Sequence, residues 1–400
     1  MSAELDDVSS LPSDHGAAAV QVHAPARLAS IDIVRGLAMV LMALDHVRDF
    51  FADPRLDPLD LSHTSTSAFL TRWITHLCAP LFVFLAGASS YLVSQRRTRA
   101  ELSGFLLTRG LWLIVLEITV VDFAWTFDLR YQTGLYLQVI WAIGVAMIVL
   151  ATLVHLPLPA IAAFSVIMIA GHNVLDGIAA ESWGDWAPLW TVLHVQGPIP
   201  HGFVEYPLIP WVAVMSLGYC MGAIFQLDAQ RRRRVLVCLG ATSLAAFVLL
   251  RMLNVYGDPR GWSLQSTTVL TLLSIVNVQK YPPSLQYLLL TLGSGFLLLA
   301  AFESARGKMS EVLRTFGRVP LFFYVLHVAL AHFAAGVVGL AMGFGAALFA
   351  TDFVSIPAQW GFGLPVVYLA WLLVVVTLYP ACRWFAEVKR RRADWWLSYL

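Results

Sequence analysis

Charged residues are scarce in this chain of 400 residues. They make up 13% of the sequence, about half the share of an ordinary soluble domain. The 26 Lys and Arg nearly balance the 25 Asp and Glu, so the net charge gives no reason to expect a nucleic-acid partner. So few charges cannot cover the surface of a water-soluble protein of this length, which excludes an ordinary soluble domain.

Cysteines and familiar catalytic motifs are also few. The four cysteines lie in apolar segments without a C-x-x-C spacing, and we expect them to be packing residues rather than a disulfide framework: Cys78, Cys220, Cys238 and Cys382. No G-x-S-x-G, P-loop or G-x-G-x-x-G motif occurs. His327 and His332 are five residues apart, whereas a two-histidine metal site on a helix needs three or four. We therefore predict no metal site.

Apolar residues dominate instead, at 58% of the chain. A membrane-spanning helix needs about 20 mostly apolar residues, and ten segments qualify: 31–51, 68–93, 105–125, 134–155, 157–173, 207–226, 235–254, 284–303, 319–343 and 361–385. The prediction is an all-α, polytopic membrane helix bundle formed by residues 27–400. Residues 1–26 are polar and lack the pattern of a secretory signal, so we expect a disordered cytoplasmic tail.

The distribution of basic residues predicts the orientation. Clusters of Arg and Lys follow the second, sixth, eighth and tenth segments, whereas the loops 174–206 and 344–360 contain neither residue. Because basic loops stay in the cytoplasm, ten crossings with both termini inside are expected. Residues 262–283 contain Lys280, Pro282 and Pro283, and a full crossing there would break the parity. A re-entrant or surface-lying segment fits better.

The first apolar segment carries ionisable residues, which are costly in a membrane unless they are paired or face water. Asp45 and His46 are neighbours near its outer end. A carboxylate that fixes the tautomer of His46 would make this side chain a general base near neutral pH. The alternative is a local ion-pair network of Asp45, Arg48 and Asp49.

Arg72 and His76 share one face of the second segment, because they are four residues apart. One would hold an anion while the other moves a proton. The alternative is that Arg72 reaches the membrane surface and His76 bonds a backbone carbonyl. Since both lie near the outer ends of adjacent spans, His46 and His76 are predicted to converge on one cavity in the outer half, with Asp45 and Arg72 beside them.

Glu117 lies near the middle of the third segment and therefore requires a partner. Arg109 is two turns away on a similar face of the same helix. We interpret these two residues as either structural or part of the lining of a pathway, with equal weight.

Several stretches resemble the heparan-alpha-glucosaminide N-acetyltransferase-like transmembrane acyltransferases, and in particular their bacterial branch. They are RLASIDIVRGLAMVLMALDH, RWITHLCAPLFVFLAGASSYL, RGLWLIVLEITVV, QVIWAIGVAMI, YPLIPWVAVMSLGY, YGDP, KYPPSLQYLLLTLG, GRVPLFFYVLH and WWLSYL. Together they cover nearly all of residues 27–400. The resemblance implies a multi-helix enzyme of a bacterial inner membrane. It would take acetyl from cytosolic acetyl-CoA and deliver it to a sugar or glycan amine or hydroxyl outside.

The resemblance leaves the identity of the base open. The family's catalytic histidine falls near His63, and a family asparagine aligns with His46. His46 and His76 lie inside the matching motifs, so they are the predicted catalytic residues together with Asp45. Arg72, Arg109 and Lys280 are the predicted contacts of the acetyl-CoA donor, since Arg and Lys hold phosphates.

A transporter or flippase for a small polar or anionic solute is the alternative from another class. Buried Asp, Glu, Arg and His would then line the transport pathway, although we find no repeated halves with broken helices of the kind that transporters show. A purely structural scaffold would leave the buried charges unexplained.

Overall fold

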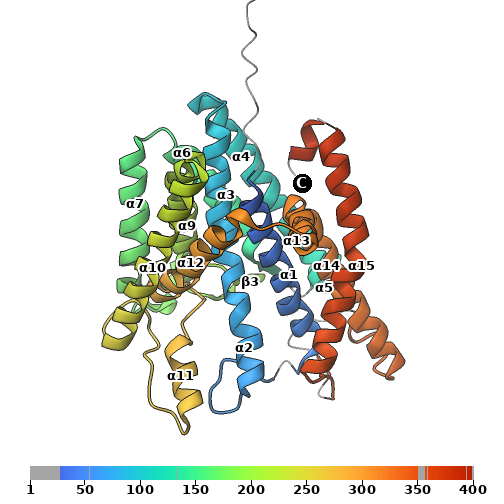
Figure 1. Ribbon diagram of the computed structural model, residues 1–400. Helices are drawn as coiled ribbons and strands as arrows, with labels where there is room; N and C mark the ends of the chain where they lie inside the picture. Colours follow the sequence, from blue (N-terminus) through green and yellow to red (C-terminus); the bar gives the residue numbers. More distant parts are fainter. Residues whose placement is uncertain are drawn as a thin grey trace, which may run out of the picture.

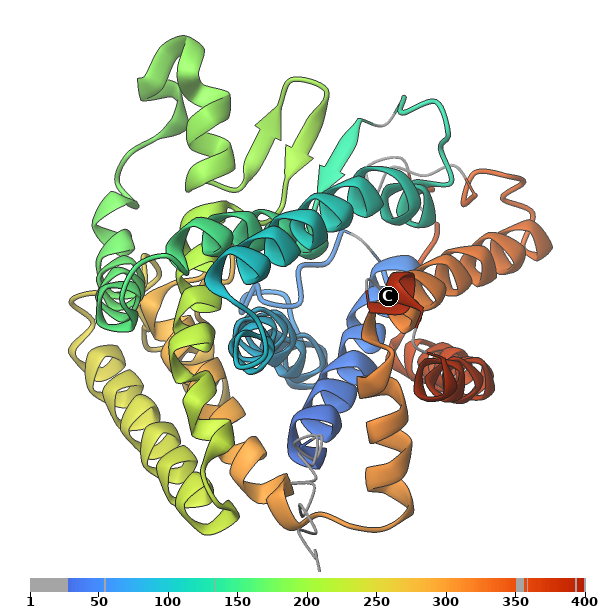
Figure 2. The same cartoon turned by 90° about the horizontal axis from the view of Figure 1, so that it is seen from above.

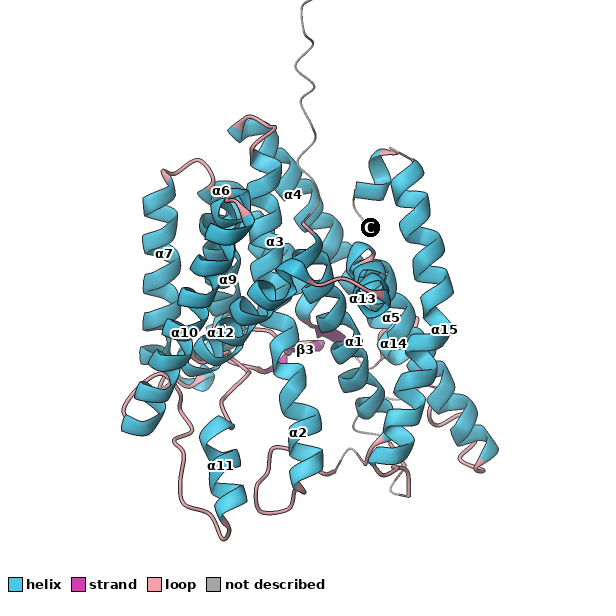
Figure 3. Ribbon diagram, viewed as in Figure 1, coloured by secondary structure: helices cyan, strands magenta, loops and turns pink. Residues whose placement is uncertain are grey.

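The computed structural model describes residues 28–53, 55–132, 134–349, 356–357, 359–392 and 394–398. The predicted tail 1–26 lies outside them. Each of the predicted apolar segments corresponds to helix, and the helices form an all-α polytopic bundle (Figures 1 and 3). The long helical stretches are α1 (Ala29–Phe51), α2 (Thr66–Ile74) to α3 (Cys78–Ser94), α4 (Arg99–Leu116) to α5 (Asp122–Thr126), α6 (Val139–Leu153), α7 (Leu158–Gly171), α9 (Leu208–Met221), α10 (Ala229–Leu253), α12 (Leu285–Ala301), α14 (Pro320–Ala341) and α15 (Leu364–Arg391).

Shorter elements connect these helices. They are the 3-10 turns Thr75–Leu77, His172–Leu175, Ala180–Trp186, Gly222–Gln226, Phe302–Ser304 and Trp395–Ser398, the π-helical turn Glu117–Val121, and the helices α8 (Ala187–Leu193), α11 (Thr268–Val276) and α13 (Lys308–Arg318). In Figure 1 helix α13 is seen end-on while α15 is seen from the side, so α13 runs across the bundle.

Eight of the described helical stretches are long and apolar enough to cross a membrane, so the protein is an integral membrane protein. Helix α6 is apolar but shorter, and α1 is long but carries several charges. The start of α1 and the end of α15 both lie in the upper half of Figure 1. The count of ten crossings and the cytoplasmic placement of the termini remain predictions.

Helix α1 occupies the centre of the bundle, where it packs against α3, α13, α14 and α15 (Figure 2). Glycines allow its closest approach. A Cβ atom on Gly36 would lie 1.8 Å from the carbonyl oxygen of Leu313, and one on Gly317 would lie 1.8 Å from that of Asp32. Small residues let membrane helices approach to backbone contact. The Gly36–Gly317 crossing therefore fixes α1 against α13.

The loop 254–284 contains a short helix rather than a crossing. Helix α11 has nine residues, less than half of what a bilayer requires. Its C-terminal end is held by Arg251, which is 1% exposed. The guanidinium donates to the carbonyls of Ile275, Ser274 and Asn277 at 2.7–2.8 Å. A buried arginine thus satisfies carbonyls that a helix end leaves without partners.

A small sheet, order β1-β3-β2, replaces the expected start of the fourth span. β1 (Leu135–Leu137) runs parallel to β3 (Gly202–Val204), which pairs antiparallel with β2 (Gly197–Ile199). The prediction that the fourth membrane segment is helical from residue 134 is therefore wrong for its first residues. Helix α6 begins only after Gln138, at Val139. The amides of Glu205 and Tyr206 bond the carbonyl of Leu137 at 3.0 and 3.4 Å. The sheet thereby brings Gln138, Glu205 and Tyr206 to one place.

Candidate active site along helix α1

One face of α1 lines three cavities that lie in a row. Arg35, Met39, Met42, His46 and Asp49 follow one another at helical spacing on this face. We call the cavities the basic cavity (about 290 Å³), the neck (about 20 Å³) and the polar cavity (about 400 Å³). The neck shares wall residues with both of the others, so the three cavities are neighbours along α1.

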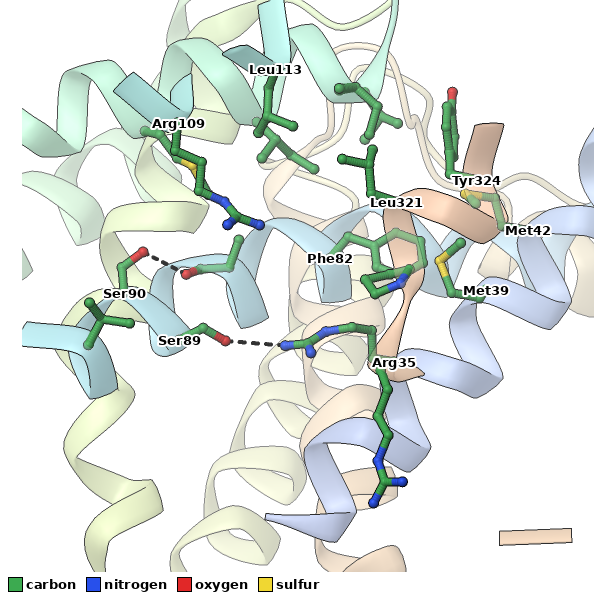
Figure 4. Close-up of a pocket in the computed structure, with 18 of the residues that line it drawn as sticks. Arg35, Met39, Met42, Phe82, Ser89, Ser90, Arg109, Leu113, Leu321 and Tyr324 are labelled. Carbon is green, nitrogen blue, oxygen red and sulfur yellow. Dashed lines mark hydrogen bonds between the residues drawn. The ribbon is translucent and has the colours of Figure 1, made fainter. Parts of the chain in front are cut away.

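The basic cavity is lined by cationic and by apolar side chains; Figure 4 shows Arg35 and Arg109 beside Met39, Phe82 and Leu113. Its cations come from four helices: Arg35, Arg109, Arg318 and Lys389. The Arg35 guanidinium donates to Ser89 Oγ at 3.2 Å. Met42, Phe82 and Val139 line both this cavity and the neck. This combination fits a ligand that is anionic at one end and slender and apolar at the other.

The neck is polar and very narrow. Asp45, His46, Gln138, Tyr206 and Lys280 line both the neck and the polar cavity. A volume of 20 Å³ holds about one water molecule. The neck as it stands therefore has no room for a sugar, and an acetyl group would have to enter it from one of the larger cavities.

Three cations surround the buried Asp45 carboxylate. Arg72 donates to Oδ2, Arg48 Nη2 lies 3.1 Å from Oδ1, and Lys280 Nζ lies 4.0 Å from Oδ2. Asp45 is 6% exposed, so these charges compensate for its burial. The alternative network with Arg48 and Asp49 exists as well, since Arg48 lies 2.5 Å from Asp49 Oδ1. The Asp45 carboxylate is therefore paired with cations.

His46 is paired with another histidine, which corrects the expectation that Asp45 orients it. His46 Nδ1 lies 2.8 Å from His327 Nε2, and His327 Nδ1 lies 2.9 Å from the carbonyl oxygen of Phe323. A carbonyl only accepts, so His327 carries its proton on Nδ1 and accepts at Nε2. In the neutral pair His46 Nδ1–H is then the donor. His46 Nε2 keeps a free lone pair.

Aromatic rings hold the two imidazoles in place. The ring of His46 meets Trp125 edge-on at 4.8 Å and lies parallel to His327 at 5.0 Å. The ring of His327 is also stacked on Phe323 at 4.9 Å. Because these contacts confine the ring, the imidazole of His46 cannot readily flip to exchange the positions of Nδ1 and Nε2.

Lys280 lies in the loop between α11 and α12, outside the helices that cross the membrane. Burial lowers the pKa of Lys280 to about 8, and the neighbouring Arg72 guanidinium adds to this effect. Its ammonium lies 4.9 Å from the ring centre of Tyr281. The charge of Lys280 is consequently sensitive to pH near the physiological range.

Comparison with known protein families gives a match over more than half of the chain. A profile described as heparan-alpha-glucosaminide N-acetyltransferase, catalytic, matches residues 27–254. The chain belongs to this family. It is thus a membrane acetyltransferase, and the matched residues include α1, Arg109 and Gln138. A comparison with individual curated proteins found no match.

The structure separates the predicted site residues of this acetyltransferase into groups. Asp45, His46, Arg72 and Lys280 line the polar cavity together. Arg109 lines the basic cavity instead.

The two other candidate histidines lie apart from these cavities. His76 is buried against the ring of Tyr287, at 5.5 Å between ring centres, and does not line the three described cavities. The expected convergence of His46 and His76 on one cavity is thus not seen. The side chain of His63 is 75% exposed in the loop after α1 and bonds Asp60 at 2.9 Å. The catalytic roles of all these residues remain proposals.

Glu117 has a structural partner that the sequence did not indicate. Its carboxylate accepts from the backbone amides of Gln138 at 3.0 Å and Trp141 at 3.2 Å. These amides belong to the first turn of α6, whose N–H groups have no helical partner. Glu117 therefore caps α6, and Arg109 is not its partner.

His327 is the site residue that sequence reasoning missed. Its spacing to His332 was tested only against metal motifs. The informative signal is that His327 follows Phe323 by four residues within an apolar helix. A histidine there can bond the preceding turn's carbonyl and so keep Nε2 as an acceptor for another helix.

Proposed function

We propose that the protein transfers an acetyl group from acetyl-CoA to the amine of a glucosaminide-like acceptor, with His46 as the general base. The observation that carries this proposal is the row of cavities along α1, with four cations lining the basic cavity and His46 at the neck. Family membership supports the reaction class. From the resemblance to bacterial relatives, we place the enzyme in a bacterial inner membrane.

The basic cavity is the proposed donor site. In the predicted topology it opens to the cytoplasm, where acetyl-CoA is made available. Arg109 and Arg318 would bind the CoA phosphates, since guanidinium groups pair well with phosphate oxygens. The pantetheine arm would lie along Met39 and Met42 toward the neck. Arg109 thus keeps its predicted role, while Arg72 and Lys280 are assigned to the acyl end instead.

His46 would act through Nε2, the nitrogen that its contact with His327 leaves unprotonated. As the acceptor amine attacks the thioester carbonyl, a C–N bond forms and Nε2 takes the amine proton. The C–S bond then breaks, and the imidazolium returns the proton to the departing sulfur. The products are the N-acetylated acceptor and CoA thiol, so atoms and charges balance. Base catalysis of this kind contributes roughly 10²–10⁴-fold.

Lys280 and Gln138 are the proposed stabilisers of the tetrahedral intermediate. Both line the neck, where the carbonyl oxygen would acquire negative charge. An ammonium and an amide N–H are suitable donors for such an oxyanion. Asp45 and Arg72 would hold Lys280 in position rather than react.

Membership of an acetyltransferase family favours the enzyme over the transporter alternative. A closed neck of about 20 Å³ does not separate the two, because a transporter that works by alternating access also has a closed constriction. An acyltransferase needs only to present the acetyl group there, while CoA and the acceptor remain on opposite sides.

The test is acetyl transfer by the purified protein in proteoliposomes, with radiolabelled acetyl-CoA outside and glucosamine inside. We expect acetylglucosamine in the lumen. His46→Ala should lower kcat roughly 10²–10⁴-fold with little change in KM for acetyl-CoA, whereas Arg109→Ala should raise that KM. His63→Ala is the matched control, because this exposed imidazole lies outside the cavities.

Two results would contradict the proposal. Full activity of His46→Ala would exclude this histidine as the base, and loss of activity in His63→Ala would move the role to the loop. Uptake of labelled glucosamine without acetylation would favour the transporter.

A further inference from the structure

Two histidines and an aspartate meet on the side of the molecule where α7 ends. His172 and Asp176 belong to the turn after α7, and His194 follows α8. One potential ligand atom from each residue lies within 4.8 Å of the others. The three residues do not line the α1 cavities. This cluster is therefore distinct from the proposed active site.

The polar atoms of the cluster are buried and poorly satisfied. His172 is 2% exposed and His194 1%. Neither ring nitrogen of His172 makes a well-aligned hydrogen bond among the described residues, although the backbone of Pro283 lies near the ring, and Asp176 Oδ1 likewise has no hydrogen-bond donor. Leaving such buried polar groups unpaired destabilises the folded protein. A ligand between the three side chains would remove this cost.

We propose that His172, Asp176 and His194 bind a divalent transition-metal ion, with Zn²⁺ as the best match. Two imidazoles and one carboxylate suit Zn²⁺ and its neighbours, whereas Mg²⁺ and Ca²⁺ prefer oxygen ligands throughout. Tetrahedral Zn²⁺ brings its ligand atoms to about 3.4 Å from one another. Small side-chain rotations close the present separation to that value. A water molecule would complete the coordination.

Neighbouring groups already orient the ligands. Asn173 Nδ2 donates to Asp176 Oδ2 at 2.8 Å, which leaves Oδ1 for the metal. Asn173 Oδ1 accepts from the backbone amide of Leu285 at 2.9 Å, so this support is anchored to α12. In metal sites, hydrogen bonds from residues that do not touch the metal typically hold the ligand side chains in orientation.

His194 has one competing contact. Its Nε2 lies 2.9 Å from the carbonyl oxygen of His172 and 3.7 Å from Asp176 Oδ1. Metal binding replaces the hydrogen bond to the carbonyl, and the proton moves to Nδ1 or is released. The ring of His194 is stacked on Trp190 at 5.3 Å, so an ion here lies close to an indole.

The ion would join two segments that the chain separates by 22 residues. It would tie the end of α7 to the residue that precedes β2 by three positions. β2 pairs with β3, which leads directly into Glu205 and Tyr206 in the wall of the polar cavity. The metal would thus stabilise the support of that wall without taking part in the reaction.

The first measurement is the metal content and Zn²⁺ affinity of the full chain, purified in detergent without a polyhistidine tag. After treatment with EDTA and its removal, we expect the wild type to bind one equivalent of Zn²⁺. Co²⁺ should give the visible absorption bands of a low-coordinate site and quench part of the tryptophan fluorescence, and a Trp190→Phe variant should show less of this quenching. Zn²⁺ should also raise the melting temperature.

Variants locate the site. His172→Ala and Asp176→Asn should each weaken Zn²⁺ binding at least tenfold and abolish the rise in melting temperature. His201→Asn is the matched control, because it removes an exposed imidazole on the nearby β2–β3 turn and should bind Zn²⁺ like the wild type. The wild-type titration is decisive even if a variant fails to fold.

Two outcomes would overturn the proposal. One is a wild type that binds no Zn²⁺ or Co²⁺ at micromolar concentrations. The other is binding that the His172→Ala and Asp176→Asn variants retain in full. Because the readouts are metal binding and stability, they stand apart from any failure of the acetyl-transfer assay.

Discussion

The contact between His46 and His327 allows a sharp test of how the base is set up. In His327→Leu the acceptor at 2.8 Å from His46 Nδ1 disappears, and no carboxylate is positioned to replace it among the described partners of His46. The donor is then left unpaired, which costs about 1–3 kcal/mol. If that cost appears in the transition state, kcat falls roughly 5- to 150-fold.

This loss should be smaller than that of His46→Ala and should leave acetyl-CoA binding unchanged. His327 does not line the basic cavity, so KM for acetyl-CoA is expected to stay within about twofold of the wild type. The pH profile should change as well, because a free imidazole populates both tautomers and only one presents Nε2 as the base. The assay is steady-state acetyl transfer at several pH values.

A conservative variant distinguishes orientation from packing. His327→Gln supplies a side-chain carbonyl that can accept from His46 Nδ1–H, so it should recover much of the lost kcat. Both variants should be compared at equal folded fraction, measured by size-exclusion chromatography and thermal melting. A kcat within twofold of wild type in His327→Leu would refute the tautomer argument. Equal defects in both folded variants would refute the acceptor role of His327.

Three further predictions concern stability and pH. Gly36→Val places a side chain where a Cβ already lies 1.8 Å from the Leu313 carbonyl oxygen, so the melting temperature should drop sharply; Gly104→Ala, whose Cβ meets nothing within 4 Å, should not change it. Glu117→Ala removes the acceptor of two backbone amides at the start of α6. The free energy of unfolding, measured by denaturation in detergent, should fall by about 3 kcal/mol. Glu117→Gln should lower the free energy of unfolding by less. Acetyl transfer should decline as pH rises through about 8, where Lys280 loses its proton, and Lys280→Arg should remove that decline.

The same lysine makes stability depend on pH with a defined sign. Its pKa is lowered in the folded protein from 10.5 to about 8. Between these values the unfolded chain binds more protons than the folded one, so the free energy of unfolding rises with pH over this window. A melting temperature that falls from pH 8 to pH 10 in the wild type, relative to Lys280→Arg, would contradict the assignment.

The sequence alone was sufficient for the class of fold and for the family. Long apolar segments have few ways to satisfy their backbone in a membrane other than as helices, so composition and segment length predicted the bundle without any knowledge of contacts. The boundary near residue 134 failed because β1 pairs with β3, nearly 70 residues later. Local hydropathy does not contain that pairing.

The site was predicted in part for the same reason. Asp45 and His46 stand out because ionisable groups in an apolar helix are expensive, and the structure brings both to the neck. The partners of His46 and Glu117 were not predicted correctly. The spacing suggested Asp45 for His46 and Arg109 for Glu117, since only neighbours on one helix are visible in a sequence.

Tertiary packing decided those partners. His46 meets His327 across 281 positions of the chain, and the carboxylate of Glu117 meets the first turn of a different helix. The proposed metal site likewise depends on a turn and a loop that only folding brings within 4.8 Å. Burial cost is a property of one residue and its segment, so the sequence determined which groups need partners. Which partner satisfies each of them depends on how helices cross, and that was decided by close approaches such as Gly36 against Gly317 in three dimensions.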